Sequence, residues 1–135
     1  IKKALEDLCS VMITKNKKPW ISLGVIGGEM LPQGLAQVII NIVDFGMNLQ
    51  EAGDAPRIHH TGSSSPTGEQ MTDGGILLLE NGFRWEVIRN LIGKGHNVKW
   101  QPGEFGGYQG ILWDDKNKVW HGASDSRLDG QAAGY

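Results

Sequence analysis

The sequence of 135 residues predicts an α+β fold, and three observations support this class. Two apolar segments, residues 11–14 and 20–25, flank a turn-forming stretch and predict a β-hairpin. Residues 32–47 repeat apolar side chains with the period of a helix. Further short strand patterns follow with one more helical pattern among them, which favours α+β over a regularly alternating βαβ order. We expect a single domain over residues 1–135.

The N-terminal half is expected to hold a short helix, the hairpin and two further helices. Residues 1–8 place apolar side chains on one helical face. Residues 16–19 predict the hairpin turn. The apolar stripe of the helix over residues 32–47 is Leu35, Val38, Ile39, Ile42 and Val43. Asn48 and Glu51 have the spacing of a capping box, which predicts a short helix over residues 49–53.

The C-terminal half is expected to be mostly strands and loops. Residues 57–60 have an extended pattern, and residues 61–75 are rich in Gly, Ser, Thr and Pro and predict a long loop. The predicted strands cover residues 76–79, 98–100, 108–113 and 119–121. A helix is expected over residues 84–94, with its inward face formed by Val87, Ile88, Leu91 and Ile92.

Composition excludes several classes of function. Thirteen Lys and Arg against 15 Asp and Glu give a net charge of −2, which argues against a nucleic-acid partner. No apolar run reaches the roughly 18 residues that a membrane span needs. The single Cys9 excludes an internal disulfide and a cysteine-based zinc site. We expect no metal and no cofactor; the compartment stays open between periplasmic, secreted and cytoplasmic.

Gly27 and Gly28 form the first candidate site, because they end a predicted strand shortly before the long helix. Successive N–H groups at such a place can face an anion or an oxyanion, assisted by the helix dipole. The alternative is a tight turn imposed by sterics. Spacing alone favours the tight turn, since a pair of glycines is a weak signal.

The polar side chains give weaker candidates. His59 and His60 are neighbours on a predicted strand and therefore point to opposite faces, which argues against a shared metal. His96 and His121 are expected at the surface or at strand ends. A buried Asp–Arg pair that pins the chain termini is expected in preference to catalysis, and its candidates are Asp44, Asp54, Arg57, Asp125, Arg127 and Asp129.

Serine and tryptophan residues do not form recognisable sites. Residues 63–65 are all serine and Ser124 is another, but none lies in a Gly-x-Ser-x-Gly elbow, so a serine hydrolase is not supported. The five Trp residues lie on separate elements and are expected to pack in the core and at its rim rather than to stack nucleic-acid bases.

An ordered set of motifs goes further than any single one. In chain order the motifs are Lys18-Pro19-Trp20, Gly27-Gly28, residues 37–41, residues 44–52 (Asp-Phe-Gly-Met-Asn-Leu-Gln-Glu-Ala), residues 54–60 (Asp-Ala-Pro-Arg-Ile-His-His), residues 95–98, residues 122–127 (Gly-Ala-Ser-Asp-Ser-Arg) and Gly134-Tyr135. From about residue 11 onward the chain resembles the gamma-glutamyltransferase (gamma-glutamyl transpeptidase) family. It is most similar to the C-terminal part of the small subunit, in the bacterial gamma-glutamyltransferase-like branch.

The resemblance implies an N-terminal-nucleophile hydrolase with a four-layer αββα sandwich shared between two subunits. In that family the precursor cuts itself, and the new N-terminal Thr attacks a gamma-glutamyl amide such as glutathione, with its own amine as base. Water, an amino acid or a peptide then takes the acyl group. The family's oxyanion hole uses backbone N–H groups of a Gly-Gly pair that matches Gly27 and Gly28, which raises the functional interpretation of this pair above the steric one.

The sequence also departs from the family. Its threonines are Thr14, Thr61, Thr67 and Thr72, none of them N-terminal, so we expect the nucleophile to lie upstream and the isolated chain to be inactive. A Ser-Ser pair that contacts the substrate carboxylate in the family aligns near Glu6 and Asp7. Two carboxylates there would repel a carboxylate, so no role is transferred to them.

Two alternatives remain open beside a fragment of a gamma-glutamyltransferase-like enzyme. One is an acylase or amidase of the same superfamily, with a different acyl pocket. The other is a degenerate module without enzyme activity. The partners expected for the leading hypothesis are a gamma-glutamyl small molecule and either the remainder of the enzyme or further copies of the chain.

Overall fold

The computed structural model describes residues 8–62, 74–103 and 105–134. Its contacts divide the chain into two compact units, one formed by residues 1–55 and 106–135 and the other by residues 56–105. The prediction of a single domain stays a prediction. The predicted helix over residues 1–8 lies outside the described residues except for Leu8, which begins a strand.

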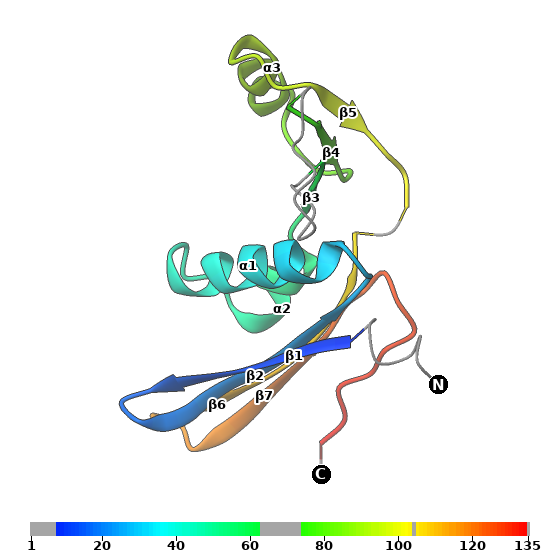
Figure 1. Cartoon of the computed structure of the whole chain (residues 1–135). Coiled ribbons are helices and arrows are strands. Elements are labelled where there is room, and N and C mark those ends of the chain that lie inside the picture. The colour runs from blue at the N-terminus through cyan, green and yellow to red at the C-terminus, as the bar shows by residue number, and fades with distance from the viewer. Residues whose placement is uncertain (1–7, 63–73, 104, 135) are drawn as a thin grey trace. The chain divides into compact units, whose positions relative to one another are not determined.

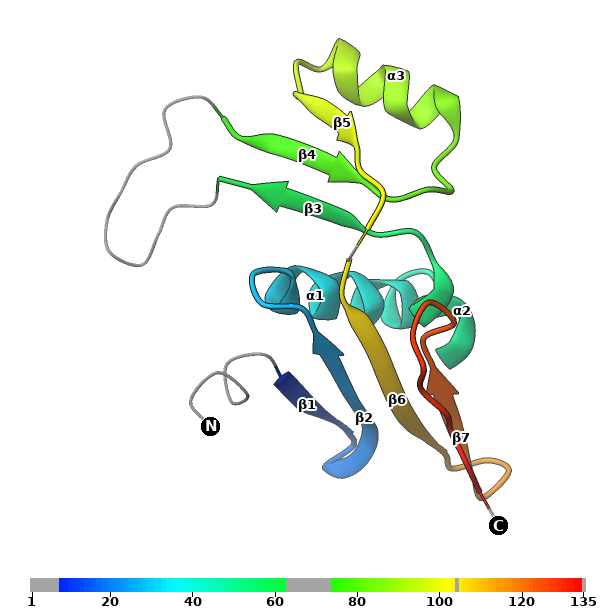
Figure 2. The ribbon, with the colours of Figure 1, turned by 90° about the vertical axis from the view of Figure 1, so that its right-hand side faces the viewer.

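The first unit is built on a four-stranded antiparallel sheet. Its strand order is β1-β2-β6-β7, as Figure 2 shows. The strands are β1 (Leu8–Lys15), β2 (Lys18–Ile26), β6 (Gly107–Asp114) and β7 (Val119–Ser124). The sheet therefore contains both predicted hairpins, and β2 and β6 pair with each other in its centre.

The first hairpin turns more tightly than the sequence predicted. Asn16 and Lys17 both have positive φ, 53° and 63°. This is the conformation of a two-residue type I′ turn, whose twist matches that of the strands. β2 consequently resumes at Lys18, and Pro19 lies within the strand beside a register shift opposite Thr14. A proline is tolerated there because the ladder is already irregular at a bulge.

Two helices cover one face of this sheet (Figure 1). The longer, α1 (Met30–Val43), starts two residues before its predicted start and ends four residues before its predicted end. It ends early because the N–H groups of Asp44 and Phe45 both bond to the carbonyl of Ile40, closing the last turn. The shorter, α2 (Leu49–Asp54), begins with the predicted capping box of Asn48 and Glu51.

The core lies between these helices and the sheet. β2 alternates, with Ile21, Leu23 and Val25 buried toward the helices. The buried residues that join them are Leu35, Val38, Ile42, Leu49, Ala52, Tyr108 and Ala123. The predicted stripe of α1 is thus confirmed at three positions. It is wrong at Val43, which is 54% exposed because it lies in the last turn.

The opposite face of the sheet has no helix over it among the described residues. The register places Met12, Ser22, Ile111 and Gly122 in a row across the four strands, on the side away from the core. Met12 and Ile111 are exposed there, as is Trp120 farther along β7. A sheet with one packed and one open face matches two of the four layers expected from the resemblance.

The second unit holds a three-stranded sheet in the order β3-β4-β5. Its elements are β3 (Ile58–Thr61), β4 (Ile76–Leu79), α3 (Trp85–Gly93) and β5 (Val98–Trp100). β4 and β5 are parallel and joined through α3, which makes one βαβ crossover within the α+β fold. None of the described helices is long and apolar enough to cross a membrane.

The inward face predicted for α3 is not buried. Ile88 and Leu91 are half-buried, whereas Val87 and Ile92 are exposed. The physical reason is the size of its partner, because α3 packs on β5, a strand of three residues.

Candidate functional site

Gly27 and Gly28 form the link between β2 and α1. The carbonyl of Gly27 accepts a hydrogen bond from Met30 N at 3.0 Å, and that of Gly28 accepts one from Leu31 N at 3.0 Å. Their carbonyls thereby close the turn that starts α1. Within the described part of the chain, the N–H groups of Gly27 and Gly28 donate to no other residue.

Backbone geometry explains why both positions are glycine. Gly27 has φ of 127°, and a Cβ there would lie 3.0 Å from the Cα of Gly106, which leads into β6. Gly28 has φ of 54°, but a Cβ would meet no atom within 4 Å. Gly27 therefore allows a close backbone approach, whereas Gly28 supplies only a left-handed conformation that other residues adopt at a cost.

No side chain at the start of α1 caps the helix in place of a bound anion. Glu29 precedes the helix, yet its side chain makes no capping hydrogen bond, and the first turn contains no acidic residue. The N–H groups of Met30 and Leu31 are already paired and Pro32 has none, so the positive character of this end comes from the dipole of the 14-residue helix and from the N–H groups of the preceding turn. The turn has the chemistry to bind an anionic oxygen.

The predicted Asp–Arg pair is present and is formed by Asp125 and Arg127. Arg127 Nη1 donates to Asp125 Oδ1 at 2.9 Å, and the Asp125 side chain is fully buried. The same guanidinium donates to the carbonyls of Gly53, Asp54 and Ala55 at 2.8–3.0 Å. This cluster fastens the end of α2 to the C-terminal segment, so its role is structural.

The other candidates of that set are distributed differently. Asp54 joins the cluster, because Ser126 Oγ donates to its Oδ1 at 2.8 Å and Gln50 Nε2 donates to its Oδ2 at 2.9 Å. Arg57 donates instead to the carbonyl of Phe105 at 3.1 Å. Asp44 and Asp129 are exposed.

The hydrogen bonds also set the ionisation of Asp54. Partial burial raises the pKa of its carboxyl, but the hydrogen bonds from Gln50 and Ser126 and the charge of Arg127 outweigh it, and the pKa lies below 3.8. Sequence reasoning missed Gln50, although its four-residue spacing from Asp54 on α2 was a signal.

The histidines do not assemble a metal site. His60 Nε2 lies 3.1 Å from the carbonyl of Gly74, while His121 faces Asp114 at 3.5 Å. His96 is exposed, as expected. Among the described residues no group of three or more His, Cys, Asp and Glu side chains could hold a metal ion.

Serine and tryptophan positions complete the set. Residues 63–65 lie outside the described residues, and Ser124 Oγ accepts a hydrogen bond from Gln109 at 2.7 Å. The expectation of packed tryptophans is wrong for Trp85, Trp100 and Trp120, which are exposed. Their elements are short or lie at a sheet edge, so little surface is available to cover them.

Comparison with known proteins gives the family. The family model of gamma-glutamyltranspeptidase matches residues 1–135. The chain is 30% identical over 135 residues to the glutathione hydrolase proenzyme of Escherichia coli (strain K12). This match covers 99% of this chain and 21% of that protein. The chain spans about a fifth of the length of the curated relatives it matches.

Solved structures agree in fold. The cephalosporin acylase from Bacillus halodurans has a TM-score of 0.79 and 35% identity over 92% of this chain and 22% of that chain. The gamma-glutamyltranspeptidase from Pseudomonas nitroreducens complexed with L-DON has a TM-score of 0.77 and 24% identity over 95% of this chain and 62% of that chain. These likenesses confirm the predicted α+β class. The chain belongs to the gamma-glutamyltranspeptidase family and has the fold of its N-terminal-nucleophile hydrolases.

Proposed function

We propose that this chain is part of an enzyme that cleaves gamma-glutamyl amides by acyl transfer, and that Gly27 and Gly28 supply its oxyanion donors. The supporting observation is the pair of N–H groups at the start of α1 that have no acceptor among the described residues, in a chain that matches this family along its whole length. The proposal requires no metal and no cofactor.

The proposed reaction needs these donors in one step, the addition of the nucleophile to the amide carbonyl. A nucleophile adds to the amide carbonyl, its proton passes to a base, and the carbonyl oxygen becomes negatively charged. The N–H groups of Gly27 and Gly28 stabilise that charge, which is larger in the transition state than in the substrate. When the amine leaves with a proton, an acyl-enzyme remains, and water or an amino acid or peptide removes the acyl group.

The nucleophile is proposed to come from outside residues 1–135. By resemblance it is an N-terminal Thr, and the described threonines do not fit. Thr14 is paired within β1, and Thr61 Oγ1 donates to the carbonyl of Ile76. We expect a polypeptide of residues 1–135 alone to release no p-nitroaniline from gamma-glutamyl-p-nitroanilide. Release above the level of a mock purification would contradict this.

The open face of the first unit's sheet supports the proposal that another polypeptide surface covers it. Met12, Ile111 and Trp120 expose apolar area that a stable monomer would cover. We propose that the remainder of the enzyme, or a second copy of the chain, packs on it. Light scattering of the isolated chain should show association, and a monodisperse monomer that does not bind anilinonaphthalenesulfonate would contradict the proposal.

An acylase is the second candidate, favoured by the 35% identity to the cephalosporin acylase from Bacillus halodurans. The two candidates differ in whether the site recognises the α-amino group of a glutamyl donor. Kinetics of the complete enzyme on gamma-glutamyl-p-nitroanilide and on glutaryl-p-nitroanilide, which lacks that amine, separates them. A site built to bind the amine should favour the first substrate by about 10⁴-fold or more in kcat/KM. A ratio near one, or a preference for the glutaryl compound, would select the acylase.

A further inference from the structure

A pocket of about 580 Å³ lies at the ends of the two hairpins of the first unit. Pro19, Trp20, Leu112 and Trp113 provide its apolar lining. Lys15, Lys18 and Lys116 also line it. The volume is in the range of small-molecule sites, which are mostly apolar with a few placed polar groups.

The two carboxylates of this pocket already have hydrogen-bond or salt-bridge partners in their own hairpin loop. Asp114 accepts hydrogen bonds from the N–H groups of Lys116 and Asn117 and from the Asn117 side chain at 2.7–3.0 Å. These bonds hold the pKa of Asp114 at about 2. Asp115 forms a salt bridge with Lys118 at 2.7 Å. Asp115 is therefore paired, whereas Asp114 is held by neutral donors and keeps its negative charge beside the pocket's lysines.

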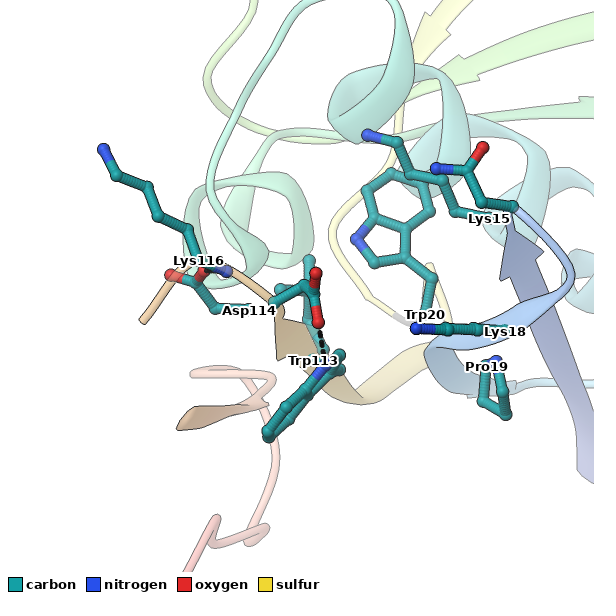
Figure 3. A pocket seen from close by; sticks show the side chains of 10 residues that line it. Lys15, Lys18, Pro19, Trp20, Trp113, Asp114 and Lys116 are labelled. Carbon is teal, nitrogen blue, oxygen red and sulfur yellow. Dashed lines mark hydrogen bonds between the residues drawn. The ribbon is translucent and has the colours of Figure 1, made fainter. Parts of the chain in front are cut away.

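The ammonium groups are left comparatively free. Lys15 Nζ lies 4.8 Å from the centre of the Trp20 ring, in a cation–π contact. Lys18 and Lys116 form no salt bridge with any described residue, although Lys18 is near enough to Asp115 to help lower its pKa. Figure 3 shows Lys18 extending from its strand toward the space between Trp20 and Trp113, whereas Lys116 extends away.

We propose that this pocket binds a small aromatic anion, with its ring against Trp20 and its acidic group between Lys15 and Lys18. An indole face provides apolar area and stacks on planar rings, while the two ammonium groups recognise a carboxylate or sulfonate. A cation is disfavoured because Asp115 is already paired with Lys118, so Lys15 and Lys18 outnumber the one remaining carboxylate, Asp114.

This site is distinct from the turn assigned to catalysis. The pocket surrounds the first residues of β2, and Gly27 follows its last residue. Seven residue steps of extended strand separate Trp20 from Gly27 by roughly 23 Å, at about 3.3 Å per residue. The bound anion is therefore a second ligand rather than the acyl donor, and failure of one proposal leaves the other intact.

The test is calorimetric titration of the purified protein that carries residues 1–135. Three probes of the same ring are compared, namely 1-naphthalenesulfonate, neutral 1-naphthalenesulfonamide and cationic 1-naphthylmethylammonium. We expect the sulfonate to bind with Kd at or below about 1 mM, about tenfold more tightly than the neutral probe. High salt should weaken the sulfonate alone, since screening acts on the charge.

Matched variants locate the binding. Lys18→Gln should weaken sulfonate binding about fivefold, and Trp20→Leu should weaken all three probes by about tenfold through lost stacking. Lys17→Gln, in the same turn but outside the pocket, and Trp85→Leu in the second unit serve as controls and should change Kd less than about twofold, which is under 0.5 kcal/mol. Lys18→Gln cannot fail through unfolding, because its side chain is exposed. Equal affinity for all three probes, no binding of the sulfonate, or an unchanged Kd in Lys18→Gln would overturn the proposal.

Discussion

The helices α1 and α3 look alike in sequence and differ in what surrounds them. Each repeats apolar residues at helical spacing. α1 buries Met30, Gly34, Leu35, Val38 and Ile42, whereas α3 buries none of its residues. α1 lies over the strand β2 of a four-stranded sheet, while α3 packs on the three-residue β5.

The difference shows which structural features apolar periodicity can predict and which it cannot. It predicts that a segment forms a helix with one apolar face. It does not predict whether the same chain supplies a surface wide enough to cover that face. Val87 and Ile92 are exposed for this reason, although their spacing equals that of buried positions in α1.

The same substitution on both helices tests the comparison and has the largest expected effect on stability. Ile42 is 8% exposed and Ile92 is 54% exposed. Ile42→Ala should lower the free energy of unfolding by about 2–5 kcal/mol, because it leaves a cavity in the core. Ile92→Ala should change it by about 0.5 kcal/mol or less. Urea unfolding of both variants measures this, and equal losses would show that α3 is also covered.

Arg127 tests the polar attachment of α2 and should have a smaller effect. Arg127→Ala removes the partner of the buried Asp125 and the donors to three carbonyls, for an expected loss of about 1.5–3 kcal/mol. Arg127 is 27% exposed, so water partly replaces the lost bonds. The control is Arg84→Ala beside α3, where the arginine makes no capping bond. The same loss of unfolding free energy in both variants would contradict a specific role of the cluster.

Acid should produce the smallest change, carried by carboxyls of the first unit. The pKa of Asp114 is about 2 in the folded chain, against 3.8 ordinarily, and that of Asp54 is also lowered. Carboxyls with depressed folded pKa values stabilise the fold above the unfolded pKa, and this contribution is lost as pH falls through the folded values. Urea midpoints should decline from about pH 4 toward pH 2. Asp114→Asn should flatten that decline, and an unchanged slope would contradict the assignment.

Much of the fold follows from local signals. The bounds predicted for β4 are those observed, and the capping box of Asn48 and Glu51 is formed as predicted. Such features depend on residues a few positions apart, whose physics is present in any short segment. The end of α1 was misplaced because Gly46 and Asn48 indicated a stop, whereas backbone bonding to Ile40 ends the helix earlier.

The candidate site was only partly predictable. The position of Gly27 and Gly28 before a helix was visible in the sequence, but the approach of Gly106 to Gly27 comes from a segment nearly 80 residues away. Likewise, Gln50 meets Ser124 because α2 packs on β7, and Lys15 shares a pocket with Lys116 through sheet pairing. No local pattern encodes these contacts.

The central claim, that the turn at Gly28 stabilises an oxyanion, is tested most directly by comparing Gly28→Ala with Gly46→Ala in the complete enzyme. The two glycines have similar φ values, 54° and 66°, and an added Cβ meets no atom within 4 Å at either. Alanine therefore brings similar backbone strain to both positions, and only at Gly28 does relief of that strain move the proposed donors. Measured on preparations of known active fraction and Tm, Gly28→Ala should lower kcat by about 100- to 1,000-fold with little change in KM, while Gly46→Ala retains normal kcat. A kcat for Gly28→Ala within about threefold of wild type, well under the tenfold that 1.36 kcal/mol represents, or an equal loss in Gly46→Ala, would contradict the account.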